Sequence, residues 1–211
     1  ERLLINVLAK NPARSDAWVK LANLQVIRGD TLSGARSLRS ALQNQNERVN
    51  PMPIWRQLAS IYGPKTRIDA LLAETPADTR FLEQLGEFYR QLARIDDPKK
   101  AVPLLERALL LFNHLTQASP GRADLFAKQG ELFLNLNRPI DARNAFVLAA
   151  KLDNRPEYHL GRAHSLLFEQ LYYPAIKILE SIKPKMAVNS EFLDKTILSL
   201  GNAYAATGKN E

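Results

Sequence analysis

The segment Leu82-x-x-Leu85-Gly86-x-x-Tyr89 decides the fold, because its pattern returns along the chain. A large residue is followed by an apolar residue, a small one and an aromatic one at constant spacing. The other copies are Trp55-x-x-Leu58-Ala59-x-x-Tyr62, Phe126-x-x-Gln129-Gly130-x-x-Phe133, Ile197-x-x-Leu200-Gly201-x-x-Tyr204 and a looser Trp18-x-x-Leu21-Ala22-x-x-Gln25. Recurrence about every thirty-odd residues predicts an array of helical repeats.

The most regular copy lies between residues 123 and 156 and shows what surrounds the pattern. Asn137-Arg138-Pro139 predicts a turn after the first helix, since proline suits the first turn of the next helix. Asn154-Arg155-Pro156 ends that second helix, because a residue before proline is pushed out of the α region. Between the two turns, one helix face carries Ala142, Phe146 and Ala149.

With these residues the chain resembles the tetratricopeptide repeat (TPR) family. The family pairs a large-x-x-Leu-Gly/Ala-x-x-Tyr first helix with a small-x-x-x-Phe-x-x-Ala second helix, and the resemblance covers nearly the whole chain. It implies an all-α, right-handed superhelical solenoid of antiparallel helix pairs. We further expect Gly86, Gly130 and Gly201 to lie where two helices approach closely, since glycine within a helix costs up to ~1 kcal/mol relative to alanine.

The pattern divides residues 1–211 into one continuous array. Its predicted parts are a second helix of a cut repeat at 1–14, repeats at 15–48, 51–78, 79–121, 122–156 and 156–188, and a first helix at 189–211. We therefore expect an array that is truncated at both ends. The cut faces would favour weak self-association of this segment.

Two repeats depart from the regular length. The second helix of one is predicted to span only residues 65–74, and that of the next to span 98–117 after a long turn at 93–98. Asp96-Asp97 and Asn189-Ser190 are the expected N-terminal caps of helices. Another turn is expected at Tyr172-Tyr173-Pro174. We predict an irregular step in the array between Gly63 and Pro76.

The composition is that of an ordinary globular protein, but its positive charge is uneven. The formal net charge is +7, and residues 1–67 contain eleven Lys/Arg against four Asp/Glu, so the rest of the chain is neutral. We therefore expect residues 1–67 to have a mild preference for an anionic partner. The basic surface that would meet it comprises Arg28, Arg36, Arg39 and Arg48. The chain has no cysteine, which excludes disulfides, thiolate metal sites and thiol nucleophiles in this segment.

Signals of catalysis are nearly absent. The sequence has no glycine-rich phosphate loop and no His-Glu-x-x-His motif. His159 and His164 are five residues apart, which differs from the i, i+4 spacing of a helical metal pair. We expect no cofactor, no metal, no catalytic residue and no membrane insertion in this segment, and we expect it not to be an enzyme.

The resemblance implies that first helices line a concave groove that holds a peptide or a partner's helix. Arg80 and Arg90 flank Glu83 and Glu87 at helical spacing, which predicts ion pairs along that helix. The full set of groove residues expected here is Asn23, Arg56, Ser60, Arg80, Glu83, Glu87, Arg90, Asp124, Glu131, His164 and Asn202.

The resulting interpretation is a non-catalytic protein–protein interaction scaffold that binds a partner protein or peptide on this concave face. The style of the repeats favours a bacterial periplasmic or envelope assembly, such as exopolysaccharide export, with the cytoplasm as the other setting. The alternative is an accessory, substrate-recruiting region of a larger glycosyltransferase or protease. Nucleic acid ranks lower because no aromatic residues interleave with the arginines. Polysaccharide ranks low because Trp18 and Trp55 occupy packing positions.

Overall fold

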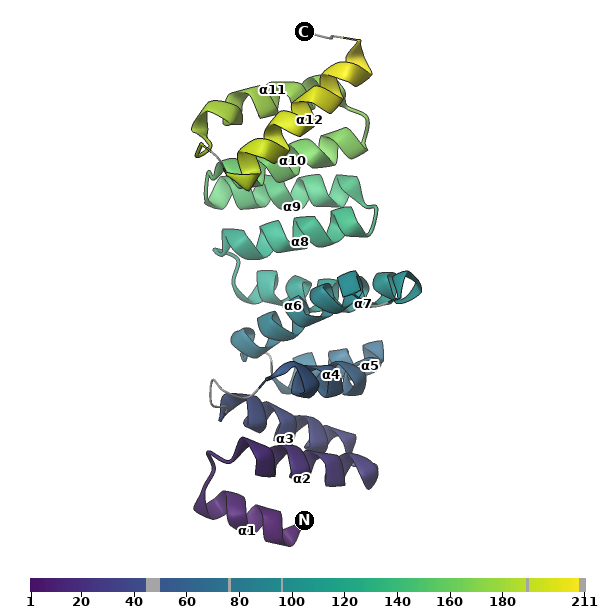
Figure 1. The fold of residues 1–211 in the computed structure, drawn as a ribbon, viewed down its shortest axis with the longest axis vertical. Coiled ribbons are helices and arrows are strands. Elements are labelled where there is room, and N and C mark those ends of the chain that lie inside the picture. Colours follow the sequence, from purple (N-terminus) through teal and green to yellow (C-terminus); the bar gives the residue numbers. More distant parts are fainter. Residues whose placement is uncertain (45–49, 76, 96, 189, 209–211) are drawn as a thin grey trace. The chain divides into compact units, whose positions relative to one another are not determined.

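The computed structural model describes residues 1–44, 50–75, 77–95, 97–188 and 190–208. Within these ranges every regular element is helical, with twelve α-helices and one short 3₁₀ turn (Figure 1). The predicted all-α, helical-repeat fold is therefore confirmed. The chain forms two compact units, residues 1–75 and 76–211, and each is described by itself.

Residues 1–75 contain five helices, in which α2 packs on α3, α1 packs on α2, and α3 contacts α4. A tight turn precedes α3, with Gly29 at φ +86°, and Asp30 caps that helix by accepting a hydrogen bond from the Ser33 amide (3.1 Å). The helices are α1 (Arg2–Lys10), α2 (Ser15–Ile27), α3 (Thr31–Gln43), α4 (Met52–Ile61) and α5 (Lys65–Glu74).

Residues 76–211 contain the more regular helix pairs. The paired helices are α6 with α7, α8 with α9 and α10 with α11, and α12 packs on α11. The bounds are α6 (Thr79–Ile95), α7 (Pro98–Ala118), α8 (Ala123–Asn135), α9 (Pro139–Leu152), α10 (Pro156–Phe168), α11 (Tyr172–Ile182), the 3₁₀ turn (Lys183–Lys185) and α12 (Glu191–Thr207).

The aromatic ring of Phe146 explains why small residues recur in the pattern. Phe146 lies on α9 and is 3% exposed. A Cβ atom added to Gly130 on α8 would lie 2.8 Å from this ring, and one added to Gly161 on α10 would lie 2.3 Å from it. Three helices can thus pack around one ring only because two of them lack a side chain there.

The same contact exists one repeat earlier but not at the end of the chain. A Cβ atom at Gly86 on α6 would lie 2.8 Å from the ring of Phe112 on α7, as predicted. The prediction for Gly201 is wrong in this structure, because a Cβ atom there meets nothing within 4 Å. The contact needs an aromatic ring from a neighbouring helix, and no described residue supplies one to Gly201.

The caps and some helix ends agree with prediction, but two turns do not. Asp97 accepts a hydrogen bond from the Lys99 amide (3.0 Å), and Ser190 accepts one from the Leu193 amide (3.1 Å). Helix α5 has the predicted bounds, and α7 ends one residue beyond the predicted end. Asp96 and Asn189 lie outside the described residues.

The predicted turn at residues 93–98 is shorter in the structure, because α6 continues to Ile95. The predicted turn at 172–174 is the first turn of α11, where Pro174 needs no intrahelical hydrogen bond. The chain reverses just before it, with Gln170 at φ +59°. The repeat boundaries stay a prediction.

We predict opposite effects of one substitution at two glycines of the same unit. Gly161→Ala should lower the free energy of unfolding by about 1–3 kcal/mol, since its Cβ would overlap the buried Phe146 ring. Gly201→Ala should raise it by about 0.5–1 kcal/mol, because alanine is the better helix former and nothing opposes it. Urea unfolding followed by circular dichroism measures both. Equal shifts for the two variants would contradict the packing role of Gly161.

Candidate functional site

All three groove residues predicted in the first unit are exposed. Asn23 lies on α2, and Arg56 and Ser60 lie on α4. Gln57 Nε2, also on α4, donates a hydrogen bond to Asn23 Oδ1 (3.1 Å) and so links the two first helices. The carbonyl oxygen of Asn23 is therefore engaged within the unit, and the exposed side chains of Arg56 and Ser60 flank this link on α4.

In the second unit, seven charged side chains form a continuous network across α6 and α8. We call them the charged stripe, which consists of Glu83, Glu87 and Arg90 on α6 and of Arg122, Asp124, Lys128 and Glu131 at the start of and along α8. Five of the seven were predicted as groove residues. The structure brings these five together.

At one end of the stripe, Glu83 is held by two cations from α8. Arg122 Nη1 lies 2.8 Å from Glu83 Oε2, and Lys128 Nζ lies 2.7 Å from Glu83 Oε1. Arg122 also pairs with Asp124, and Lys128 reaches Glu87 Oε1 at 3.1 Å. Lys128 thus bridges both carboxylates of α6.

Arg90 completes the other end of the stripe. Its Nε lies 3.1 Å from Glu87 Oε2, and its Nη1 pairs with Glu131 on α8. The predicted pair between Arg90 and Glu87 is confirmed. The ion pairs of Glu83 differ from the predicted pairing with Arg80. The partners of Glu83 in the charged stripe come from α8, whereas Arg80 is an exposed residue of α6.

Sequence reasoning missed Arg122 and Lys128. A signal for Lys128 was present, because it lies four residues after Asp124 and three before Glu131. Residues at these spacings share one helix face. Arg122 precedes the first turn of α8, and its position in the stripe depends on how the chain enters that helix.

Ion pairing in the stripe favours the charged forms of several of its side chains. Burial opposes ionisation of Glu83, yet hydrogen bonds from Arg122 and Lys128 lower the pKa of its carboxyl group. A hydrogen bond from Arg122 likewise lowers the pKa of Asp124. Burial also opposes the charge of Lys128, but Glu83 and Glu87 raise its pKa. The contacts across α6 and α8 therefore favour the charged forms of Glu83, Asp124 and Lys128.

The last two predicted groove residues lie near the end of the second unit. His164 on α10 is partly buried, and its Nε2 lies 2.8 Å from Ser199 Oγ on α12. Burial and nearby Lys195 lower the pKa of His164, which favours its neutral imidazole. His164 thus joins two helices of the unit. Asn202 on α12 is exposed.

The predicted basic surface is partly neutralised by nearby carboxylates. Arg28 pairs with Glu1, and Arg36 Nη2 lies 3.1 Å from Glu74 Oε1. Arg39 is partly buried on α3, and Arg48 lies outside the described residues. The positive charge of this unit is therefore less concentrated than the residue count suggests.

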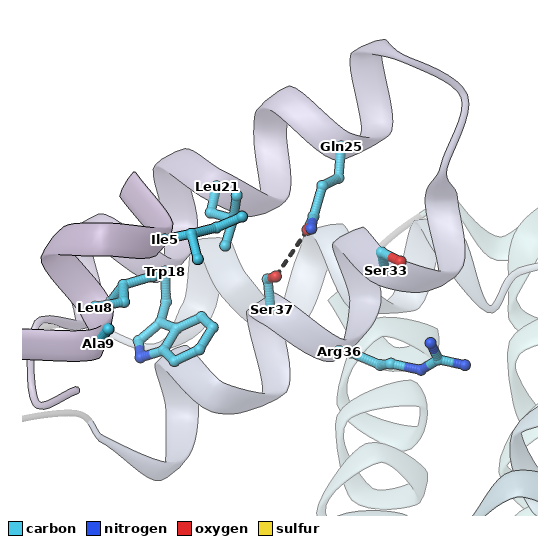
Figure 2. A pocket seen from close by; sticks show the side chains of 9 residues that line it. All are labelled: Ile5, Leu8, Ala9, Trp18, Leu21, Gln25, Ser33, Arg36 and Ser37. Carbon is cyan, nitrogen blue, oxygen red and sulfur yellow. Dashed lines mark hydrogen bonds between the residues drawn. The ribbon is translucent and has the colours of Figure 1, made fainter. Parts of the chain in front are cut away.

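A pocket of about 440 Å³ opens between the first three helices of residues 1–75. Each helix contributes three lining residues, whose side chains are drawn in Figure 2. They are Ile5, Leu8 and Ala9 on α1, Trp18, Leu21 and Gln25 on α2, and Ser33, Arg36 and Ser37 on α3. Pockets of ~300–1,000 Å³ are typical of ligand sites. Of these residues, only Arg36 had been singled out as a candidate binding residue from the sequence.

Among the described residues, no group of three or more His, Cys, Asp or Glu side chains is placed to hold a metal ion. His159 contacts Asn154 Oδ1 through Nε2 (2.6 Å), and His164 contacts Ser199. Over the same residues, no helix combines the length and apolar character that crossing a membrane requires.

We predict that the stabilising effect of Glu83 depends on pH. Because the folded protein lowers the pKa of this carboxyl group, its contribution is present above the unfolded-state value of about 4.3 and disappears as the pH falls through the folded-state value. Glu83→Gln should lower the free energy of unfolding by about 1 kcal/mol at pH 7. Urea unfolding at pH 7 and pH 3 measures this difference, and an equal loss at both pH values would show that the charge of Glu83 is not responsible.

The sequence matches no protein-family model and no curated protein sequence. Its structure is similar to that of a thermophilic TPR protein of Thermus thermophilus, with a TM-score of 0.54 and 18% identity over 88% of this chain and 98% of that chain. A tetratricopeptide repeat protein of Parabacteroides merdae has a TM-score of 0.53 and 17% identity, over 92% of this chain and 74% of its own.

A third similar structure is that of human IFIT1, solved as a dimer with PPP-AAAA, at a TM-score of 0.50. It is 18% identical, and the match covers 98% of this chain but 54% of that protein. Identities at this level support the fold and not a shared activity. Together with the repeated glycine–aromatic contacts, the comparisons show that this chain has the fold of tetratricopeptide repeat proteins.

Proposed function

We propose that this chain is a non-catalytic scaffold that binds a partner protein or peptide on its first helices. The TPR-type fold supports this role in general terms. The observation that carries the proposal is the charged stripe on α6 and α8, because it presents a defined pattern of charge to the surroundings.

The inner residues of the stripe are positioned before any partner arrives. The side chains of Glu83, Glu87, Arg90 and Lys128 are between 17% and 28% exposed, and each is paired. A surface whose side chains are already ordered loses little conformational entropy when it binds. Such preorganisation favours specific recognition over a loose electrostatic attraction.

The outer residues of the stripe are the ones that a partner can reach. Glu131 is 51% exposed, and Arg122 and Asp124 are each 43% exposed. Four carboxylates face three cations in the stripe as a whole, so it has a small negative excess. An extended segment with charges of both signs and a basic excess fits this pattern, because carboxylates can accept further hydrogen bonds.

The finer setting is a bacterial envelope assembly such as exopolysaccharide export. This part of the proposal rests on the style of the repeats alone. Fractionation of the source cell, with detection of the protein in periplasmic or envelope fractions, is the measurement that tests it.

We predict that reversing the two outer carboxylates of the stripe strongly reduces partner recovery. The test is a crosslinking pull-down from an extract of the source cell, with the wild-type chain and the variant Asp124→Lys/Glu131→Lys as baits. A specific partner should be reduced by about tenfold with the variant, since unfavourable charge contacts replace favourable ones.

The matched control carries two equal charge reversals on second helices, Asp69→Lys on α5 and Glu106→Lys on α7. Both residues are exposed, and neither belongs to the stripe. The control bait should recover the partner as the wild type does. Equal recovery with all three baits would place the binding surface elsewhere and contradict the proposal.

A further inference from the structure

The pocket of residues 1–75 opens on a different side of α2 from the predicted groove. Leu21 and Gln25 line the pocket, whereas Asn23 belongs to the groove set. Asn23 is two positions from each of them, which corresponds to about 200° around a helix of 3.6 residues per turn. A ligand in the pocket would therefore not compete with a partner on the first-helix face of α2.

The pocket has an apolar part and a polar part, as Figure 2 shows. Leu8 and Leu21 are almost fully buried, while Ile5 is 49% exposed and borders the opening. Trp18 adds an aromatic surface, and its indole Nε1 donates to the Pro12 carbonyl (2.9 Å), which holds the ring in place. These residues can receive one bulky apolar side chain.

The polar part offers hydrogen-bond donors. Ser37 Oγ donates to Gln25 Oε1 (2.7 Å), so the amide group of Gln25 is left with its NH₂ as a donor. Ser33 contributes a hydroxyl group. Arg36 uses Nη2 for Glu74, but a guanidinium has five N–H donors, and this side chain is 59% exposed. It can hold Glu74 and a second carboxylate together.

The charge of the pocket matches an anionic ligand. One of its nine lining residues is a cation, and none is acidic. The unit as a whole also has a positive excess, since residues 1–75 contain eleven Lys/Arg against six Asp/Glu, one of which is Glu74, the partner of Arg36. Arg36 and the positive excess of the unit would both attract a ligand with a carboxylate, whereas they would repel a basic ligand.

From this geometry we propose that the pocket binds an extended peptide segment of a partner protein in which a bulky apolar residue is followed by an acidic residue three positions later. The spacing comes from α2, where Trp18 and Gln25 are seven residues apart, roughly 10 Å along the helix axis. An extended peptide covers that length in about three residues. The apolar side chain lies against Leu8, Trp18 and Leu21, and the carboxylate faces Arg36.

Fluorescence polarisation with synthetic peptides tests the proposal on the ligand side. The probes are end-blocked, fluorescein-labelled peptides Gly-Ser-X-Ser-Ser-Glu-Ser-Gly, with Leu, Phe or Met at X. At least one should bind saturably. Serine at X should weaken binding by about tenfold or more, since the apolar contact is lost. Glutamine in place of the glutamate should weaken it by about threefold to tenfold.

Protein variants test the proposal on the pocket side. Arg36→Gln should weaken binding severalfold, while Arg28→Gln, which removes an equal charge outside the pocket, should not. Ala9→Phe places a ring in the pocket from an exposed position and should abolish binding. Its control is Ile27→Phe, a ring added at an exposed site on the opposite side of α2 from Trp18.

In a Trp55→Phe background, Trp18 supplies a second, independent signal, because it is then the one tryptophan in the sample. Binding in the pocket should change its fluorescence emission with the same midpoint as the polarisation curve. Circular dichroism of each variant shows whether it is folded.

Three outcomes would overturn the proposal: no saturable binding up to millimolar peptide, equal effects of Arg36→Gln and Arg28→Gln, or full binding by folded Ala9→Phe. None of them would affect the stripe, whose variants are assayed separately. Binding that Asp124→Lys/Glu131→Lys abolishes while Ala9→Phe leaves it unchanged would assign the peptide to the stripe instead.

Discussion

The ring of Phe146 occupies space that two neighbouring helices leave empty, and this contact sets how closely α8, α9 and α10 approach. One repeat earlier, the ring of Phe112 fills the space left by a single glycine, Gly86. A ring packed against bare backbone brings helix axes near enough for side chains on the first helices to reach across. The charged stripe spans α6 and α8, and it is Phe112 on α7 that lies against Gly86 of α6 and near Lys128 of α8.

A direct link joins the core contact to the surface. Lys128 Nζ lies 5.8 Å from the centroid of the Phe112 ring, a distance at which a cation interacts favourably with an aromatic face. The same ammonium group contacts Glu83 and Glu87. The aromatic residue that packs the helix pair therefore also positions the cation at the middle of the stripe. Packing and surface electrostatics are connected through one side chain.

The repeat pattern predicted a close approach of helices at Gly86 and Gly130, because the small residue recurs at constant spacing, but it did not identify the rings of Phe112 and Phe146 as the groups that they meet. It could not predict the ion pairs of Glu83, whose partners Arg122 and Lys128 lie 39 and 45 residues away. Arg80 offered an equally plausible partner at helical spacing. Proline was ambiguous at residue 174, since it can end one helix or stand in the first turn of the next. The pocket was not predictable, because three separate helices line it.

The shared contacts of the stripe restrict how the sequence can change over evolution. Arg90 serves both Glu87 and Glu131, and Glu83 serves both Arg122 and Lys128. Loss of one inner charge removes a contact from two neighbours at once. Tolerated changes should therefore come in groups that span α6 and α8, and related sequences should show correlated substitutions between these positions. An isolated reversal at Lys128 would be the rarest, since this residue joins the most contacts.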